Sequence, residues 1–313
     1  MPCRICSNNI DNESFAVREM MFGTREVFVY FRCARCGCLQ IAEMPTDLSA
    51  HYPPGYCSFK PSLERRFAGR LRNLFRLPRY RYAVLGGGWW GRALYALSPK
   101  PKLRKLARLD LTTSSRVLDV GCGTGSLLYK LREIGFEHLL GVDAFIDGDI
   151  EYGNGLSILK TTIDAVEGAW DCVMFNYSLE HMSDQHATLA SAARLLAENG
   201  KCFVQIPLVS SYAWEHYGVN WAQLDAPRHL YLHSRDSFGR LAAGCGFRIE
   251  DVTYDSTDFQ FTASECYARD IPLESERARR MFSRREIRAF RRQAAALNRE
   301  ERGDQAAFIL RKE

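Results

Sequence analysis

The sequence predicts an α/β protein in which a parallel sheet lies between two layers of helices, preceded by a small cysteine-rich module. Two observations predict this arrangement. From residue 114 onward, short apolar stretches alternate with segments of helical spacing, a pattern typical of parallel strands joined by helical crossovers. Five of the eleven cysteines fall within the first 38 residues, and clustered cysteines in a reducing compartment are more typical of a metal site than of disulfides.

Length and composition agree with one large domain and a smaller one. The chain has 313 residues, of which 46% are hydrophobic and 25% charged, as in an ordinary globular protein with a real core. We expect a cysteine module at 1–45, a basic and partly helical segment at 46–109, and the α/β domain at 110–313. The start lacks the pattern of a signal peptide and no apolar run reaches about 18 residues, so we expect a cytoplasmic protein.

The cysteine module contains two Cys-x2-Cys pairs, Cys3 with Cys6 and Cys33 with Cys36, separated by 26 residues. Four thiolates at this spacing can close a tetrahedral Zn²⁺ site, which would be structural because no coordination position stays open. The alternating residues 26–31 between the pairs predict a strand. Cys38 is an alternative ligand to Cys36, although the paired spacing favours Cys36.

A basic segment follows the module. The Pro-Pro-Gly run at 53–55 predicts a break in regular structure. Residues 60–109 then contain fourteen Lys or Arg and one acid, giving +13, whereas the rest of the chain carries −8. Four interpretations stay open: a solvated helical face, a contact with a phosphate-bearing substrate, a peripheral contact with an anionic membrane, and RNA binding. The acidic remainder of the chain counts against nucleic acid.

From residue 114 the predicted elements alternate in the order of an α/β sheet. Each strand is a short apolar run, and each helix has apolar residues at helical spacing. The clearest helices are 126–133 and 186–197, and residues 274–302 are helical and rich in Arg. The expected strands are 116–120, 138–142, 170–176, 201–206, 247–254 and 306–310.

A glycine loop follows the first of these strands. Gly121, Gly123 and Gly125 form G-x-G-x-G rather than the dinucleotide pattern G-x-G-x-x-G. Glycines let the backbone approach a ligand closely, and the helix that follows presents free N–H groups to it. Asp119 precedes the loop and Asp143 ends the next strand. An acid at the position of Asp143 can accept hydrogen bonds from ribose hydroxyls, and Asp119 is placed to act near a cationic amino acid moiety.

Residues 114–256 resemble the class I S-adenosylmethionine (SAM)-dependent methyltransferases. The matching motifs are VLDVGCGTGSLL, GVDAF, WDCVMFNYSLEHM and GKCFVQIP. The resemblance implies a Rossmann-like seven-stranded sheet of order 3-2-1-4-5-7-6, with the end of the chain as its last, antiparallel strand. It also implies site roles: the three glycines line the methionine and ribose of SAM, Asp143 holds the ribose, Asp164 lies near the adenine, and Asn176 and Ser178 form the floor.

The segment after the fourth strand bears on the methylated atom. The resemblance associates amino-methylation of nucleic acid with (Asn/Asp)-Pro-Pro-aromatic, whereas this chain has Asn176-Tyr177-Ser178-Leu179, which favours an oxygen or carbon acceptor. A hydroxyl acceptor needs a base. His181, in Leu-Glu-His, and His229 are the candidates, with Asp225 placed to orient His229. The alternative is that both are structural histidines.

The N-terminal module and residues 225–232 resemble those of bacterial methyltransferases of polysaccharide or secondary-metabolite pathways. The sequence therefore leads to the hypothesis of SAM-dependent O-methylation of a sugar, nucleotide-sugar or glycan intermediate. Two alternatives stay open: an RNA methyltransferase whose zinc module binds nucleic acid, and a non-catalytic scaffold that binds SAM and zinc.

Overall fold

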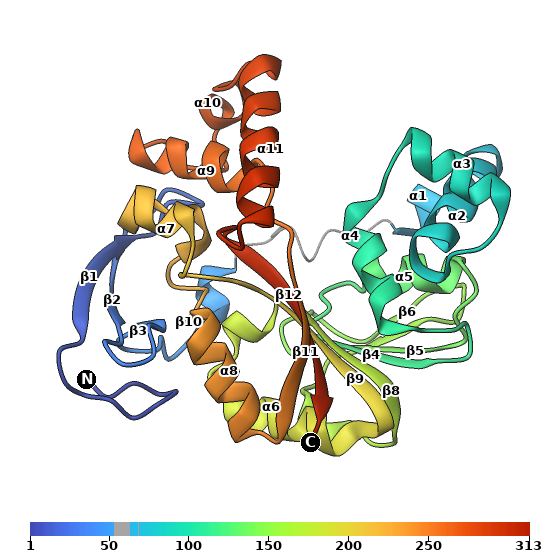
Figure 1. Cartoon of the computed structure of the whole chain (residues 1–313), viewed down its shortest axis with the longest axis horizontal. Helices are drawn as coiled ribbons and strands as arrows, with labels where there is room; N and C mark the ends of the chain where they lie inside the picture. The colour runs from blue at the N-terminus through green and yellow to red at the C-terminus, as the bar shows by residue number, and fades with distance from the viewer. Residues whose placement is uncertain (53–62, 68) are drawn as a thin grey trace. The chain divides into compact units, whose positions relative to one another are not determined.

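The computed structural model describes residues 1–52, 63–67 and 69–313 (Figure 1). The break expected at 53–55 lies outside the described residues. The chain forms two compact units: the first holds residues 1–51, 179–186 and 205–308, and the second holds 52–178, 187–204 and 309–313. These units cut across the expected segments 1–45, 46–109 and 110–313.

The main sheet has eight strands in the order β11-β12-β9-β8-β4-β5-β7-β6. Strands β4 and β5, β4 and β8, and β5 and β7 pair in parallel, whereas β6 pairs antiparallel with β7. When the strands other than β6 are numbered 1 to 7 in chain order, their order across the sheet from β7 to β11 is 3-2-1-4-5-7-6. The strands are β4 (Arg116–Val120), β5 (His138–Val142), β6 (Ile150–Glu151), β7 (Ser157–Leu159), β8 (Trp170–Asn176), β9 (Leu196–Pro207), β11 (Phe247–Tyr254) and β12 (Gln305–Lys312).

Three details of this sheet differ from the prediction. Strands β6 and β7 were not expected because two and three residues are too few to show any periodicity. Strand β9 begins at Leu196, five residues before the expected start, and therefore includes Gly200. A Cβ atom at Gly200 would lie 2.8 Å from the carbonyl oxygen of Trp170. Glycine usually weakens a strand, but it is required at position 200 because the backbones of β8 and β9 approach each other closely there.

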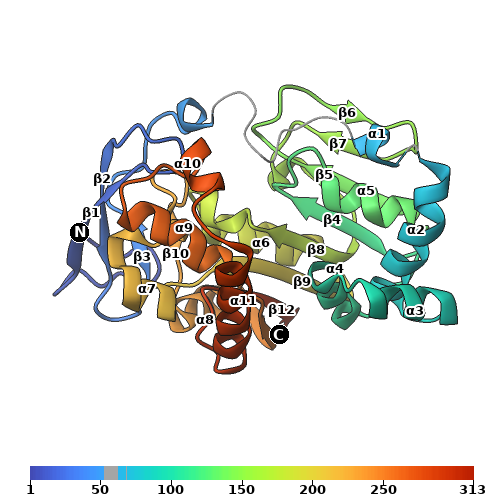
Figure 2. The same ribbon diagram turned by 90° about the horizontal axis from the view of Figure 1, so that it is seen from above.

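Helices of the second unit cover its part of the sheet and extend beyond it (Figure 2). Helix α5 (Ser126–Glu133) starts directly after the glycine loop and buries Leu128 and Leu131. Helix α6 (Gln185–Leu195) precedes β9. The basic segment is helical, as expected: α1 (Leu63–Phe67), α2 (Arg70–Leu85), α3 (Trp89–Leu97), α4 (Pro101–Arg104) and the 3-10 turn Lys105–Leu109. Another 3-10 turn covers Ile163–Ala165.

The first unit builds a second sheet from the cysteine module. Its order is β1 (Glu13–Arg18), β2 (Val27–Arg32), β3 (Leu39–Ile41) and β10 (Tyr231–Leu232), all antiparallel. The buried core under it joins Tyr30 and Phe31 to Trp221 and Leu230. The cysteine module therefore shares its buried core with residues between 209 and 232, as expected of about 45 residues that bury little surface alone.

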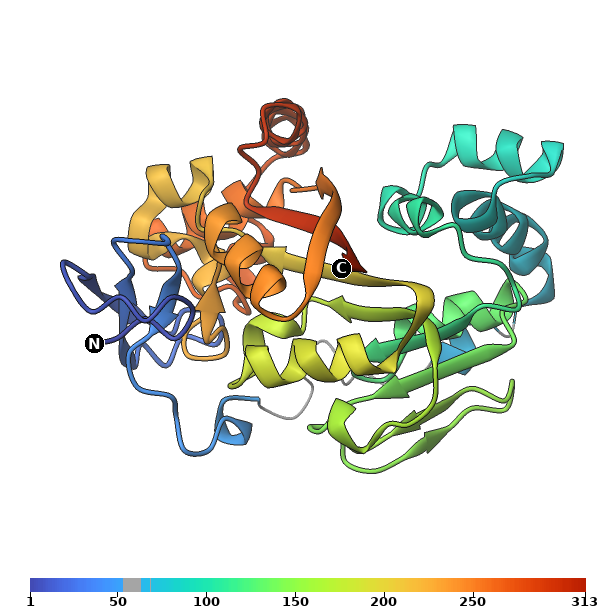
Figure 3. The same cartoon turned by 60° about the horizontal axis from the view of Figure 1, so that its bottom comes forward.

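The rest of the first unit is mostly helical. Helix α8 (Arg235–Gly244) lies along β11 (Figure 3), and Phe238 of α8 packs on Phe308 of β12 at 4.4 Å between ring centroids. No described helix is both long enough and apolar enough to span a bilayer. The other helices are α7 (Tyr212–Tyr217), α9 (Phe259–Ala268), α10 (Glu276–Arg279) and α11 (Arg284–Arg299), with 3-10 turns at Ser49–His51, Leu179–His181, Gly218–Asn220 and Ala222–Leu224.

Candidate active site

The glycine loop lies in the second unit, between β4 and α5. Gly121 and Gly125 both have φ near +70°, a region that other residues rarely adopt. A Cβ atom at Gly121 would lie 2.4 Å from Cβ of Ser178, and one at Gly125 would lie 2.4 Å from Cδ1 of Ile158. The loop therefore tolerates only glycine at both positions, and its backbone turns directly into the N-terminus of α5, where N–H groups face outward.

Asp143 lies beside this loop at the end of β5. Its Oδ2 accepts the Gly123 N–H at 2.8 Å, and its Oδ1 accepts the Phe145 N–H at 2.8 Å. A carboxylate has about four lone-pair sites, so each oxygen keeps one for a further donor. This arrangement fits two adjacent ribose hydroxyls, while the two backbone donors fix the carboxylate in place.

Asp119 is the second acid near the loop. Its side chain is only 2% exposed, and Oδ1 has no hydrogen-bond partner among the described residues. Burial, together with the charge of Asp143, raises the pKa of Asp119 to about 8. An unpartnered buried carboxylate is costly unless a donor or cation approaches it. The glycine loop, Asp143 and Asp119 together fit the cationic donor SAM.

Three other predicted cofactor residues lie in the same unit. Ser178 is buried and donates from Oγ to the carbonyl oxygen of Val120 at 2.6 Å. Asn176 ends β8 and is followed by Tyr177 at φ +57°, a left-handed conformation that is typical of functional turns. Asp164 is exposed and accepts a hydrogen bond from Ser191 Oγ at 2.7 Å. The roles of Asn176, Ser178 and Asp164 toward SAM stay predictions.

Both predicted histidines lie in the first unit, where their rings are neighbours. Their centroids are 4.7 Å apart with an interplanar angle of 71°. Nδ1 of His229 lies 2.7 Å from the carbonyl oxygen of Gln223, and Nδ1 of His181 lies 2.9 Å from that of Arg228. A carbonyl oxygen only accepts, so each Nδ1 carries a hydrogen and each neutral ring has its lone pair on Nε2.

The surroundings of the two rings favour the neutral form. Burial and the neighbouring His229 lower the pKa of His181 to about 3. Burial also lowers the pKa of His229, although Asp225 opposes this shift. A neutral imidazole can accept a proton from a nearby hydroxyl group through Nε2, but a pKa of about 3 makes His181 a very weak base, so His229 is the stronger candidate.

Glu180 joins these histidines and is absent from the predicted site residues. One carboxylate oxygen of Glu180 and one nitrogen of each imidazole lie within 4.8 Å of one another. Glu180 is buried, and neither carboxylate oxygen has a hydrogen-bond partner among the residues that the structure describes. Burial raises its pKa to about 8. Its position in Leu-Glu-His was the available signal, but burial without a partner appears only in the tertiary structure.

The structure corrects the expected role of Asp225. Its carboxylate binds the guanidinium of Arg228, with distances of 2.6 Å to Nη2 and 3.0 Å to Nε. The nearer oxygen to His229 is 3.9 Å from Nε2, beyond hydrogen-bond length. The carbonyl of Gln223 orients His229 instead, because it binds the opposite ring nitrogen. Asp225 can still stabilise a protonated His229 by its charge.

Arg228 is the centre of a buried ion-pair network that the sequence did not predict. Its guanidinium also binds Glu19 Oε1 at 2.9 Å and the carbonyl oxygen of His51 at 3.2 Å. Glu19 in turn accepts N–H groups of the turn that begins at Phe22. This network ties the β1–β2 turn to the segment that carries His229.

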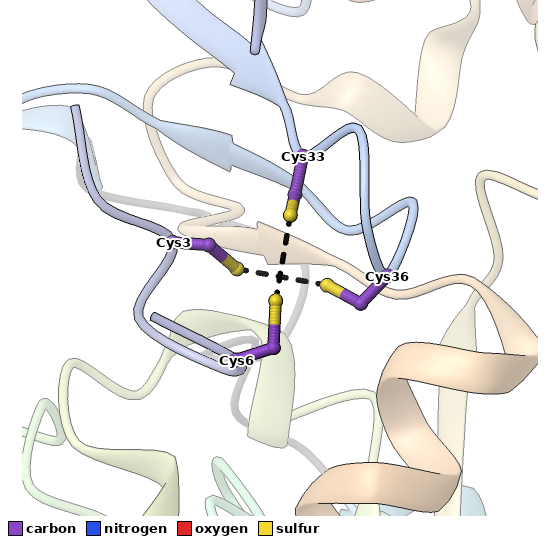
Figure 4. A group of neighbouring side chains, drawn as sticks. All are labelled: Cys3, Cys6, Cys33 and Cys36. Carbon is purple, nitrogen blue, oxygen red and sulfur yellow. Dashed lines mark hydrogen bonds between the residues drawn. The ribbon is translucent and has the colours of Figure 1, made fainter. Parts of the chain in front are cut away.

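The four predicted metal ligands meet in the first unit (Figure 4). The Sγ atoms of Cys3 and Cys36 are 3.6 Å apart, those of Cys6 and Cys33 are 3.5 Å apart, and all four lie within 4.8 Å of one another. These distances are too long for disulfides. Cys38 is buried outside this group, so the geometry selects Cys36 over Cys38.

Comparison with known proteins agrees with this geometry. Residues 90–252, more than half of the chain, match a family model described as a methyltransferase domain. The chain belongs to the SAM-dependent methyltransferases. This methyltransferase is 30% identical over 145 residues to the ubiquinone biosynthesis O-methyltransferase of Xanthomonas oryzae pv. oryzae, and the match covers 40% of this chain and 58% of that protein. The chain therefore spans less than two thirds of that relative's length.

Two further matches concern this methyltransferase. It is 28% identical over 163 residues to phosphoethanolamine N-methyltransferase 1 of Triticum aestivum, covering 48% of this chain and 32% of the wheat protein. It also matches the crystal structure of a SAM-dependent methyltransferase from Archaeoglobus fulgidus with a TM-score of 0.41 and 20% identity, covering 72% of this chain and 100% of that one.

Proposed function

We propose that this methyltransferase transfers a methyl group from SAM to a hydroxyl oxygen of a small acceptor, in particular a sugar, nucleotide-sugar or glycan intermediate. The observation that carries the proposal is the pair of neutral imidazoles of His181 and His229 beside buried Glu180. A hydroxyl must lose its proton when its oxygen is methylated, and the Nε2 lone pair of His229 can accept it.

SAM supplies an activated methyl group on a positively charged sulfonium. Asp143 would hold the ribose, and Asp119 would balance positive charge in the donor, while the glycine loop gives the donor access to backbone N–H groups. In the first unit, His229 would accept the acceptor's proton on Nε2. The carboxylate of Asp225, 3.9 Å from that nitrogen, would stabilise the imidazolium that forms. Glu180, protonated at neutral pH, would donate a hydrogen bond to the acceptor.

The substrate class rests on narrower support. Residues 1–56 and 225–232 resemble bacterial methyltransferases of polysaccharide or secondary-metabolite pathways, and the Xanthomonas relative is named an O-methyltransferase. The relative's name favours oxygen as the methylated atom. The sugar or glycan acceptor, whether or not it carries phosphate, is supported by the resemblance alone, and the cytoplasmic location is proposed from the sequence pattern alone.

We also propose that Cys3, Cys6, Cys33 and Cys36 bind one structural Zn²⁺. Sulfur atoms at the corners of a tetrahedron around zinc, with Zn–S distances of about 2.3 Å, lie about 3.8 Å apart, close to the distances of 3.5 and 3.6 Å found here. Gln40 Nε2 donates to Sγ of Cys3 at 3.1 Å, and hydrogen bonds of this kind orient metal ligands. Elemental analysis should find one zinc per chain, retained in Cys38→Ala and lost in Cys33→Ser.

The proposed activity is tested in two steps. Calorimetry should show SAM binding that is weakened at least tenfold in Asp143→Ala. Transfer of labelled methyl groups to a panel of nucleotide-sugars and other hydroxylated acceptors should then fall by about 100-fold or more in His229→Asn, with SAM affinity unchanged. Binding of SAM without transfer to any acceptor would support the scaffold alternative, and equal transfer by His229→Asn would remove that residue's proposed role.

A further inference from the structure

Helices α2 and α3 of the second unit carry an unusual share of exposed apolar side chains. Thirteen large hydrophobic residues are exposed in the described part of the chain, and six of them lie between residues 70 and 97. We call these six the hairpin patch: Leu71, Leu74, Phe75, Trp89, Trp90 and Leu97. Clustered exposure of this kind marks an interaction site more often than scattered exposure does.

The hairpin patch is continuous across both helices. Leu71, Leu74 and Phe75 are spaced i, i+3, i+4 and share one face of α2. The Phe75 and Trp90 rings lie 6.1 Å apart, and those of Trp89 and Trp90 lie 5.7 Å apart. These contacts join the exposed side chains of α2 to those of α3.

Two features fix the hairpin. A Cβ atom at Gly91 would lie 2.5 Å from the carbonyl oxygen of Pro78, so α3 packs directly on the α2 backbone. Three glycines, Gly86 to Gly88, join the helices, all with φ near +70°. The hairpin patch is therefore a feature of a packed helix pair and not of a loose segment.

Three exposed arginines of the two helices form no ion pair among the described residues. Residues 69–109 contain no Asp or Glu. Arg70, Arg72 and Arg92 are exposed, and none forms an ion pair with any residue that the structure describes. A partner for this surface must contact both apolar and positively charged groups. It must therefore offer negative charge next to an apolar layer.

We propose that the α2–α3 hairpin binds the surface of an anionic lipid bilayer, an inference that goes beyond the methyl-transfer function and does not rest on it. Leucine and aromatic side chains would enter the interface, where tryptophan is favoured, while the arginines pair with lipid phosphates. RNA would use the arginines and the aromatic rings but leaves Leu71, Leu74 and Leu97 without a role. The contact is peripheral, because none of the described helices is able to span a bilayer.

Tryptophan fluorescence offers a direct test. The chain has five tryptophans; Trp89 and Trp90 are 81% and 42% exposed, whereas Trp170, Trp214 and Trp221 are at most 7% exposed. Vesicles of phosphatidylcholine with 30% phosphatidylglycerol should shift the emission of the full chain to the blue and sediment with it. Pure phosphatidylcholine vesicles should do neither. Raising NaCl from 0.1 to 0.5 M should lower the partition coefficient at least tenfold.

Matched variants test whether vesicle binding depends on the hairpin patch or only on the net charge of the chain. Arg70→Glu/Arg72→Glu and Leu74→Ser/Trp89→Ser should each weaken vesicle binding at least tenfold. Arg288→Glu/Arg292→Glu, an equal charge change on exposed positions of α11, and Val27→Ser/Val29→Ser, on the exposed face of β2, should bind as the wild type does. Trp89→Phe/Trp90→Phe should keep most binding but lose the blue shift.

Several outcomes would overturn the proposal. One is equal affinity for neutral and anionic vesicles, and another is an equal loss of binding in the α11 variant. Self-association that depends on the hairpin patch, with no vesicle binding, would identify a second copy of the chain as the partner. Salt-sensitive binding of single-stranded RNA without vesicle binding would identify nucleic acid instead.

Discussion

Two sets of largely buried carboxylates in this methyltransferase differ in whether a cation pairs with them. Glu19 and Asp225 share the buried guanidinium of Arg228. Burial alone would raise their pKa values, but Arg228 opposes it for both, aided at Glu19 by backbone N–H groups, and the net pKa of each is lowered. Among the residues that the structure describes, no cation pairs with Asp119 or Glu180, and burial raises the pKa of each to about 8.

We infer from this difference that the paired acids stabilise the fold, whereas the charge of the unpaired acids is compensated only when a ligand binds. A buried charge is tolerated when a cation and hydrogen bonds compensate its lost hydration. Where nothing compensates it, the folded state is destabilised unless a bound molecule supplies the partner. Paired acids should therefore contribute to stability, whereas unpaired acids should reduce stability and serve binding or catalysis. Four predictions, from the largest expected effect to the smallest, test this comparison.

Arg228→Met removes the cation from the paired set. It should lower the free energy of unfolding by about 3–5 kcal/mol, because Glu19 and Asp225 are left buried and unpaired. Urea denaturation of the wild type and the variant measures the difference. The double variant Arg228→Met/Glu19→Gln should recover part of the loss. A loss below about 1 kcal/mol in the single variant would mean that the network does not stabilise the fold.

Glu180→Gln removes an unpaired acid, so it should raise stability while lowering methyl transfer. Glu180 keeps its proton in the folded state up to pH about 8, whereas an unfolded glutamate loses it near 4.5. Wild-type stability conferred by this group is therefore complete below about pH 4.5 and declines as pH rises toward 8. The variant should gain about 1–3 kcal/mol at pH 7, and the gain should vanish near pH 4.5.

Denaturation curves between pH 4.5 and 8 measure this difference, with the exposed Glu167→Gln as the control. A gain that does not change with pH would contradict the assigned protonation of Glu180. Unchanged methyl transfer would show that this carboxyl is not part of the active site.

Asp119→Asn keeps the shape of the second unpaired acid but removes its charge. SAM affinity should fall about tenfold, or roughly 1.4 kcal/mol, because a bound cation favours the ionised carboxylate of Asp119 and asparagine cannot supply that charge. Calorimetry with SAM measures this change. Asp171→Asn, an exposed position at the amino end of β8, should bind SAM as the wild type does. Unchanged affinity in Asp119→Asn would assign the unpaired oxygen a role other than donor binding.

Exposed ion pairs should have the smallest effect on the free energy of unfolding. Arg302 and Glu215 form a pair at 2.6 Å, but both side chains are about half exposed. Water screens such pairs, so Arg302→Gln should change the free energy of unfolding by no more than about 0.5 kcal/mol. Thermal unfolding at low and high salt measures the change. A loss as large as that of Arg228→Met would show that burial is not what separates the two classes.

Local sequence patterns predicted most of the scaffold. Strands β4, β5, β8 and β11 and helix α5 lie where apolar periodicity placed them. The glycine spacing located a loop that tolerates no side chain at Gly121 or Gly125. The Cys-x2-Cys pairs identified four thiols that do meet. Each of these signals lies within a few residues and therefore can be interpreted without knowing the rest of the fold.

The candidate site was predicted less completely. His181 and His229 were expected separately, but nothing in the sequence places their rings 4.7 Å apart. Asp225 was expected to orient His229, yet a backbone carbonyl has that role, and Asp225 binds Arg228. Backbone partners carry no sequence signal because every residue has a carbonyl. Glu180 was overlooked because only the packing around it removes its hydrogen-bond partners.

The sequence by itself determined the class of fold, the position of the glycine loop and the identity of the four thiols that meet, because these depend on periodicity and short spacings. Only the tertiary structure decided which buried acids are paired. Glu19 meets Arg228 across 209 positions of the chain, whereas Asp119 and Glu180 meet no such cation in the described part of the chain. Charge compensation inside a protein depends on distance in space and on exclusion of water, and neither can be read along the chain.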